Sequence, residues 1–185
     1  MSITKLNNLS ISAVTALPSG VGGKVLQVVQ TVKSDTASST SATFTDISGM
    51  SASITPSSAS NKILVFFDIG ISGGGGSSGC PGMIKLLRGS TSIYVGDAAG
   101  SRETGYGSIY ADPAYYGDAY AVAKMTGVYL DSPSTTSSTT YKIQFRANTS
   151  GTTTVYLNST GDTSNNANLI RTASSVTLME IAPWL

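Results

Sequence analysis

The chain has 185 residues, of which 40% are hydrophobic and only 11% are charged, with a formal net charge of +1. That length is usual for one domain, whereas an average soluble domain is roughly 25% charged, so the low charge predicts surfaces that are buried against other chains. The sequence contains no run of Lys or Arg that could neutralise phosphates, and we therefore expect no nucleic-acid ligand.

Residues 1–23 differ in character from the rest of the chain. Their apolar residues are spread among Ser, Thr and Asn, and a Pro- and Gly-rich stretch at 18–23 closes the segment. This pattern predicts an extended N-terminal arm and hinge that docks on a neighbouring protein, with a disordered terminus as the alternative. The candidate anchoring residues are Ile3, Leu6, Leu9, Ile11, Val14 and Leu17.

From Lys24 onward the pattern becomes strand-like, and residues 24–185 are predicted to form a single domain. The first candidate strands are residues 24–33, 42–47 and 51–55. Residues 62–71 are apolar on both faces as far as Phe67, which predicts a central strand that is covered on both sides. A hairpin is expected where residues 83–87 and 93–95 flank a short connection that contains Gly.

The second half of the chain continues the same alternation of strands and turns. Residues 141–147 place apolar side chains on one face and charged or amide side chains on the other, which predicts one face in the core and one in water. The other candidate strands are residues 119–130, 153–157 and 175–181, and the longer loops are 72–82, 96–118 and 158–174. With no helical periodicity, these elements predict an all-β fold, an antiparallel β-sandwich of jelly-roll type.

The residue types that carry most enzyme chemistry are scarce. The sequence contains no histidine, which removes Ser-His-Asp and Cys-His catalysis, the usual zinc ligands and the commonest general base near neutral pH. A single cysteine, Cys80, cannot form an intrachain disulfide. The Gly run at residues 73–76 lacks the ending of a phosphate-binding loop. We therefore expect a protein that is not an enzyme and that has no cofactor and no metal.

A tyrosine cluster is the strongest candidate contact surface for a partner or receptor. Its members are Tyr106, Tyr110, Tyr115, Tyr116 and Tyr120. Tyrosine offers a flat apolar ring and a hydroxyl at low entropic cost, which suits the recognition of a protein or a sugar. The alternative is that these rings pack beneath the loop or across a subunit interface.

The chain carries no sequence signal for export or membrane insertion. No apolar stretch reaches the roughly 20 residues of a membrane helix. The N-terminus lacks the charged-then-apolar form of a signal peptide. We expect synthesis in the cytoplasm without a cleaved signal, and no insertion into a membrane.

Six short segments, spread over nearly the whole chain, resemble small virion appendage proteins of aquatic and cyanobacterial phages. They are residues 3–8 (ITKLNN), 23–28 (GKVLQV), 87–91 (LRGST), 95–102 (VGDAAGSR), 129–133 (YLDSP) and 177–182 (TLMEIA). The resemblance implies a jelly-roll domain behind an N-terminal arm, in a tail-fibre, head-fibre or decoration protein at the virion surface. It also implies a homotrimer whose residues 1–23 attach to capsid, portal or tail proteins. Because these motifs are not catalytic, no functional residue carries over.

The leading interpretation is a fibre or receptor-binding appendage that contacts a host surface glycan or protein. A cement or decoration protein that stabilises the capsid is the alternative. A carbohydrate-binding lectin and a polysaccharide depolymerase are weaker alternatives, and for the latter Asp112 and Asp118 are the candidate carboxylates.

Overall fold

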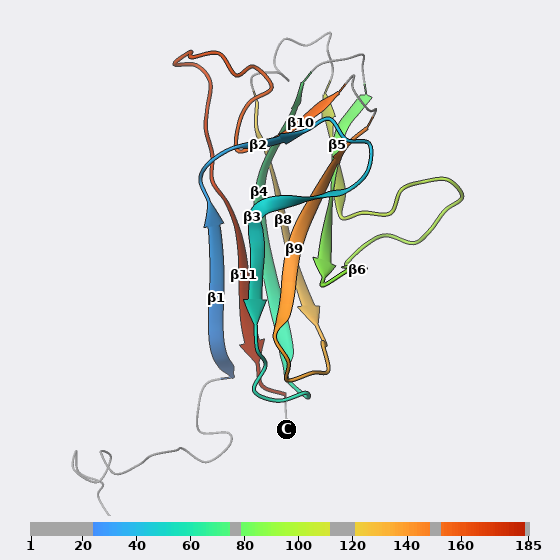
Figure 1. The fold of residues 1–185 in the computed structure, drawn as a ribbon, viewed down its shortest axis with the longest axis vertical. Helices are drawn as coiled ribbons and strands as arrows, with labels where there is room; N and C mark the ends of the chain where they lie inside the picture. The colour runs from blue at the N-terminus through green and yellow to red at the C-terminus, as the bar shows by residue number, and fades with distance from the viewer. Residues whose placement is uncertain (1–23, 75–78, 112–120, 149–152, 184–185) are drawn as a thin grey trace, which may run out of the picture.

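A computed structural model describes residues 24–74, 79–111, 121–148 and 153–183, and in these ranges all regular secondary structure is β-strand (Figure 1). The strands are β1 Val25–Lys33, β2 Ala37–Ser39, β3 Thr45–Ile54, β4 Lys62–Gly74, β5 Gly79–Arg88, β6 Thr91–Ile93, β7 Gly107–Ala111, β8 Ala123–Asp131, β9 Thr139–Ala147, β10 Thr154–Leu157 and β11 Ser174–Ile181.

The strands form two antiparallel sheets that pack face to face. In the six-stranded sheet β1, β11, β4 and β8 lie side by side, and β10 and then β2 continue the sheet beyond the end of β11. In the five-stranded sheet β3, β9 and β5 lie side by side, while β6 and β7 both pair with β5. This arrangement confirms the predicted β-sandwich. The jelly-roll connectivity stays a prediction, with which the strand order is compatible.

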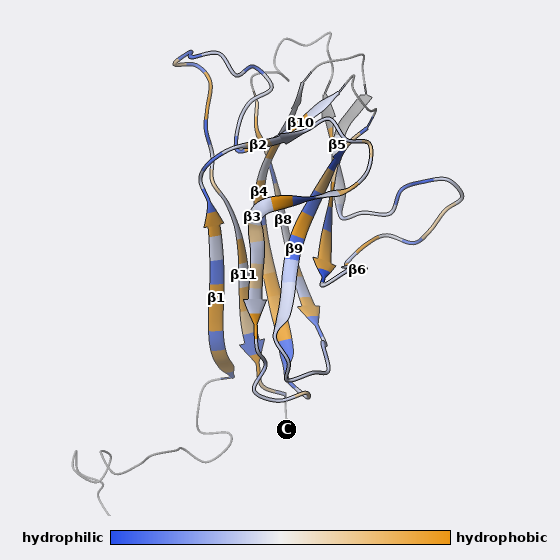
Figure 2. Ribbon diagram, viewed as in Figure 1, coloured by the Kyte–Doolittle hydropathy of each residue, from blue (hydrophilic) through white to orange (hydrophobic). Residues whose placement is uncertain are grey.

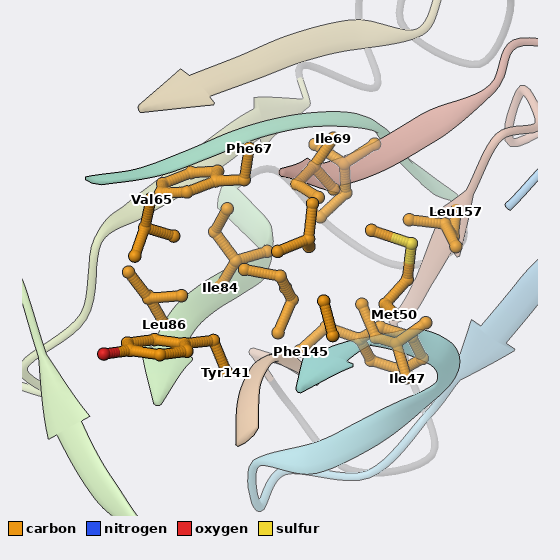
Figure 3. Packing of buried hydrophobic residues seen from close by; sticks show 14 of the residues in the cluster. Ile47, Met50, Val65, Phe67, Ile69, Ile84, Leu86, Tyr141, Phe145 and Leu157 are labelled. Carbon is orange, nitrogen blue, oxygen red and sulfur yellow. The ribbon is translucent and has the colours of Figure 1, made fainter. Parts of the chain in front are cut away.

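Strand alternation places one face of each sheet in a shared core. Every second residue of β4, beginning at Ile63, is at most 3% exposed as far as Ile71. Figure 3 shows Val65 and Phe67 of β4 on the same side of the core as Ile69, above Leu86 of β5. Burial of such side chains stabilises each by about 1.5–3 kcal/mol relative to exposure, so this core is the main source of stability.

The alternation that the sequence predicts over residues 141–147 is confirmed in β9. Tyr141, Ile143 and Phe145 are buried, whereas Lys142 and Gln144 lie on the outer face. Figure 2 shows hydrophobic and hydrophilic residues alternating along this strand. The period of two therefore located the core face correctly.

The predicted loop at residues 72–82 is wrong for most of its length, because β4 continues to Gly74 and β5 begins at Gly79. Glycine is a poor strand former, which is why the sequence suggested a loop. Tertiary packing overrides that preference at Gly82, where a Cβ atom would lie 2.6 Å from Val155 Cγ2. Only a residue without a side chain allows β5 and β10 to approach so closely.

Several strand boundaries also differ from those expected. The predicted strands 42–47 and 51–55 are one strand, β3, whose register against β9 shifts between Asp46 and Ser51, with Gly49 at a φ of +80° in the irregular segment. The short strands β2 and β7 were not predicted, because three to five residues carry little periodicity. The predicted hairpin is confirmed as β5 and β6, with Gly89 at a φ of +58° in its turn.

A buried polar group joins the two sheets at one end of the sandwich. Arg88 at the end of β5 donates from Nη1 to both carboxylate oxygens of Asp131 in β8 at 2.9 Å. The buried Tyr141 hydroxyl donates to Asp131 Oδ2 at 2.6 Å. Burial, and then the hydrogen bond to this carboxylate, raise the pKa of Tyr141 far above its ordinary value. Arg88 and Tyr141 of one sheet thus supply the hydrogen-bond donors for the carboxylate of Asp131 in the other sheet.

A second buried polar group ties the segment after β10 to the ends of β1 and β11. Asn158 is 0% exposed and has a φ of +58°. Its Nδ2 donates to the carbonyls of Lys33 at 2.8 Å and Asp35 at 3.0 Å, and its Oδ1 accepts from Ser174 Oγ at 2.6 Å. These bonds satisfy the carbonyl of Lys33, at the last pair of the β1–β11 ladder, and the carbonyl of Asp35 just beyond it.

Candidate functional site

Of the predicted contact tyrosines, Tyr106 is the one whose side chain the structure describes. It is half-buried just before β7; its ring meets Phe67 edge to face at 4.7 Å, and its hydroxyl donates to the carbonyl of Thr126. Tyr110 belongs to β7. The remaining tyrosines, Tyr115, Tyr116 and Tyr120, lie outside the described residues, and so do the candidate anchoring residues Ile3, Leu6, Leu9, Ile11, Val14 and Leu17.

Tyr106 belongs to an aromatic cluster where β8 lies near the end of β6. The Tyr94 ring lies 5.3 Å from Tyr106 and is stacked at 5.1 Å on Tyr129 of β8. Tyr94 has a φ of +53° and is 42% exposed. Burial, and then the neighbouring Tyr94, raise the pKa of Tyr106 above its ordinary value. Sequence spacing could not reveal this cluster, because Tyr94 and Tyr129 come from separate elements.

The cluster borders a hollow of about 490 Å³, which is within the usual size range of small-molecule sites. Tyr94, Tyr106 and Phe67 line it from the core side of the six-stranded sheet, whereas Phe66, Asp68, Val128 and Ser175 line it from the outer face of that sheet. The exposed ring of Tyr94 can stack on a sugar ring, and its hydroxyl can hydrogen-bond the hydroxyls of the sugar. The arrangement is therefore suited to contact with a polar ligand.

Gly127 of β8 makes room for the ring of Phe67 behind this hollow, and we expect Gly127→Ala to destabilise the protein by about 1–3 kcal/mol through overpacking. An added Cβ would lie 2.2 Å from Phe67 Cζ. Urea unfolding of the variant measures the loss. Combining it with Phe67→Leu removes the clashing ring, so the double variant should lose less than the sum of the single losses. Additive losses would contradict this account of Gly127.

The outer face of the six-stranded sheet is a second candidate surface. We define the outer apolar face as Val28 of β1, Leu64 and Phe66 of β4, Val128 and Leu130 of β8, and Met179 of β11. Strand pairing aligns Val28, Met179, Leu64 and Leu130 in one row across the sheet, and Phe66 pairs with Val128 in the next row.

This face is open to solvent in the described part of the protein. Val28, Val128 and Leu130 are 54%, 52% and 48% exposed, and Leu64 and Phe66 are half-buried. The sequence predicts that other residues cover β4 on both sides. Within the described residues this prediction is wrong, because only the core side of β4 is covered. The sequence pattern nevertheless identified a strand whose outer face is as apolar as the face of a buried strand.

The described residues contain no helix that could cross a bilayer. Among the same residues, no three His, Cys, Asp or Glu side chains lie close enough to hold a metal ion. No protein-family model and no curated protein matches the chain.

Proposed function

We propose that this protein is a structural component of a phage virion and not an enzyme, namely a fibre or receptor-binding appendage that associates with copies of itself and attaches through residues 1–23. The outer apolar face is the observation that carries the proposal. The face has a row of apolar side chains that are about half exposed, on a chain with only 11% charged residues. Such a surface is typical of a protein–protein interface.

Buried networks at Asp131 and Asn158 connect the strands and sheets of the sandwich, which suits a structural protein. The aromatic hollow offers a contact for a host surface glycan or protein. The sequence resemblance supplies the virion context, and self-association through the homotrimer that it implies fits a weakly charged domain.

The direct test is to locate the protein in purified particles. We expect antibodies against residues 24–185 to label intact virions, and a chain that lacks residues 2–22 to fold but to be missing from particles. An Ile170→Glu variant is the matched control, because Ile170 is 56% exposed and lies in the segment between β10 and β11, so incorporation should be normal. Absence of the full-length chain from virions would overturn the proposal.

A capsid cement protein is the alternative within the same class. Particles that lack the protein would then lose resistance to heat or chelators, whereas particles lacking an appendage would stay stable and fail to adsorb to cells. The release of reducing ends from host glycans by the purified protein would instead favour the depolymerase alternative.

Sugar binding at the aromatic hollow is a second candidate function, favoured by the exposed ring of Tyr94. Tyr94→Ala removes that ring while leaving Tyr106 on Phe67, so glycan-array binding should fall at least tenfold, equivalent to about 1.4 kcal/mol. Tyr156→Ala, in β10, is a control away from the hollow. Equal glycan binding by both variants would show that the hollow is not the sugar-binding site.

A further inference from the structure

We infer that the outer apolar face is a contact between two copies of this chain, packed face to face with antiparallel β4 strands, so that Lys62 of one copy lies opposite Asp68 of the other. The inference rests on the proposed self-association but not on the threefold number that the resemblance implies, since a two-fold contact joins copies in pairs. It does not depend on attachment to a virion.

The first argument is the pattern of β4. A strand that is apolar on both faces is typical of a sheet covered on both sides. Core side chains cover one face of β4, while Leu64 and Phe66 on the other face have exposed neighbours in Val128 and Leu130. A second layer packed on this face would bury all four side chains.

The second argument is that the part of the face on β4 and β8 complements itself. A two-fold axis that lies in the interface, perpendicular to β4 at Val65, places residues equally far before and after Val65 opposite each other. Leu64 then meets Phe66 of the other copy. Because Leu130 pairs with Leu64 and Val128 with Phe66, Leu130 meets Val128 in the same way. Such a two-fold contact uses the same surface on both copies.

The third argument is charge. The same axis places Lys62 opposite Asp68, since each is three residues from Val65. Lys62 Nζ donates to Ser132 Oγ at 2.9 Å and forms no ion pair within the described residues. The Asp68 carboxylate binds Lys124 through Oδ2 at 3.0 Å, whereas its Oδ1 is buried and has no hydrogen-bond partner within the described residues, so Lys62 of the other copy would share Oδ2 with Lys124. Opposite charges thus flank an apolar centre at both ends of the contact.

The packing angle of sheets is compatible with this pairing. Two sheets that pack face to face are rotated relative to each other by about 30°. The central strands of the two sheets are therefore displaced least from alignment with each other. Three residues along a strand span about 10 Å. A rotation of about 30° shifts a group at that distance by about 5 Å, and the flexible side chain of Lys62 can compensate for such a shift.

The size of the face also suits a second copy. Four strands about 4.8 Å apart and about eight residues long cover on the order of 500 Å². This area includes the polar ends of the strands, among them Lys62 and Asp68, as well as the apolar rows at the centre. Two such faces bury about 1,000 Å² in total, which is at the low end for specific interfaces and is typical of weak, reversible contacts.

Charge reversal tests the register of the contact. Lys62→Asp and Asp68→Lys each create two like-charge contacts per dimer, so each should raise the dissociation constant of self-association about tenfold at low salt. The double variant K62D/D68K restores opposite charges across the contact and should lower the constant below that of either single variant, but not fully to the wild-type value, because the ion pair of Asp68 with Lys124 in its own chain stays broken. Sedimentation equilibrium over a range of protomer concentrations measures the constant, and circular dichroism checks folding.

An apolar-to-charged change tests the centre of the face. Leu130→Glu buries an unpaired charge against Val128 of the other copy and should raise the dissociation constant at least a hundredfold. Ile170→Glu, a change of the same chemistry away from the face, should leave it unchanged. A chain lacking residues 2–22 should still associate. This result would show that a second copy, and not the N-terminal segment, covers the face.

Three outcomes would overturn the inference: a wild-type chain that stays monomeric, a double variant no better than its single parents, or self-association that Leu130→Glu leaves intact. A trimer unaffected by these changes also counts against it, because the two-fold contact joins copies in pairs. Virion labelling is independent of all these measurements, so a monomeric chain would remove the proposed self-association and leave the proposed role in the virion standing.

Discussion

Asp131→Ala is expected to lower the free energy of unfolding by about 3 kcal/mol, one of the two largest effects that we predict for a single substitution. Asp131 is 5% exposed and accepts hydrogen bonds from Arg88 and from the buried Tyr141 hydroxyl. Removing the carboxylate leaves a partly buried guanidinium without its counter-ion and a buried hydroxyl without a partner. Urea unfolding near neutral pH, at one protomer concentration for all variants, measures the loss.

The matched control is Asp46→Ala on the outer face of the five-stranded sheet. Asp46 binds Lys142 at 2.8 Å but is 54% exposed, so solvent screens the pair and the loss should stay below about 1 kcal/mol. Hydrogen bonds from Lys142 and then Gln144 lower the pKa of Asp46. Equal losses for the two variants would show that burial of Asp131 adds nothing to the strength of its contacts.

A double-mutant cycle separates the two partners of Asp131. Tyr141→Phe removes one donor and leaves the pair with Arg88 in place, so the loss should be about 1 kcal/mol. The effects of Asp131→Ala and Tyr141→Phe should be less than additive, since both remove the same hydrogen bond. Because Arg88 and Tyr141 lie in one sheet and Asp131 in the other, this coupling measures contact between the sheets.

Asn158→Ala is expected to cost about 3 kcal/mol, because it leaves the buried carbonyl of Lys33 and the partly buried carbonyl of Asp35 without their donor. Alanine also tolerates the φ of +58° at this position less well than asparagine does. Urea unfolding gives the total loss. Hydrogen exchange of amides in β1 and β11 should rise together, because the side chain joins both strand ends.

Two further variants separate the causes of that loss. Asn158→Gly tolerates the positive φ and still lacks the side-chain bonds, so it should recover only about 1 kcal/mol relative to Asn158→Ala. Asn165→Ala, at an exposed position in the same segment, should change stability by less than about 0.5 kcal/mol. Full recovery by the glycine variant would mean that backbone strain, and not hydrogen bonding, dominates at this position.

These two networks also bear on the interface. Asp131 fixes the end of β8 beside Leu130, and Asn158 fixes the ends of β1 and β11 on the other side of β4. Both strands contribute to the outer apolar face, so the networks hold its rows in register. Stability losses from Asp131→Ala are therefore expected to weaken self-association as well, whereas Lys62→Asp should weaken association without changing the stability of the monomer.

Local patterns predicted most of the strands and, for residues 141–147, the face that lies in the core. The alternation in residues 141–147 and the apolar run in residues 62–71 depend on neighbours within one strand, which the sequence displays directly. The sequence failed where packing outweighs propensity: Gly82 lies inside a strand because Val155 packs against its backbone, and the short β2 forms because β10 offers three residues for pairing.

Sequence alone determined that this chain is an all-β protein with a central strand apolar on both faces, because strand periodicity is a property of consecutive residues. Only the tertiary structure decided which side chains become neighbours, since register joins segments far apart in the chain. It placed Tyr94 on Tyr129, Asn158 on Lys33 across 125 positions, and Leu130 beside Leu64. The outer apolar face exists only in that register, since its residues come from four strands that no local pattern brings together.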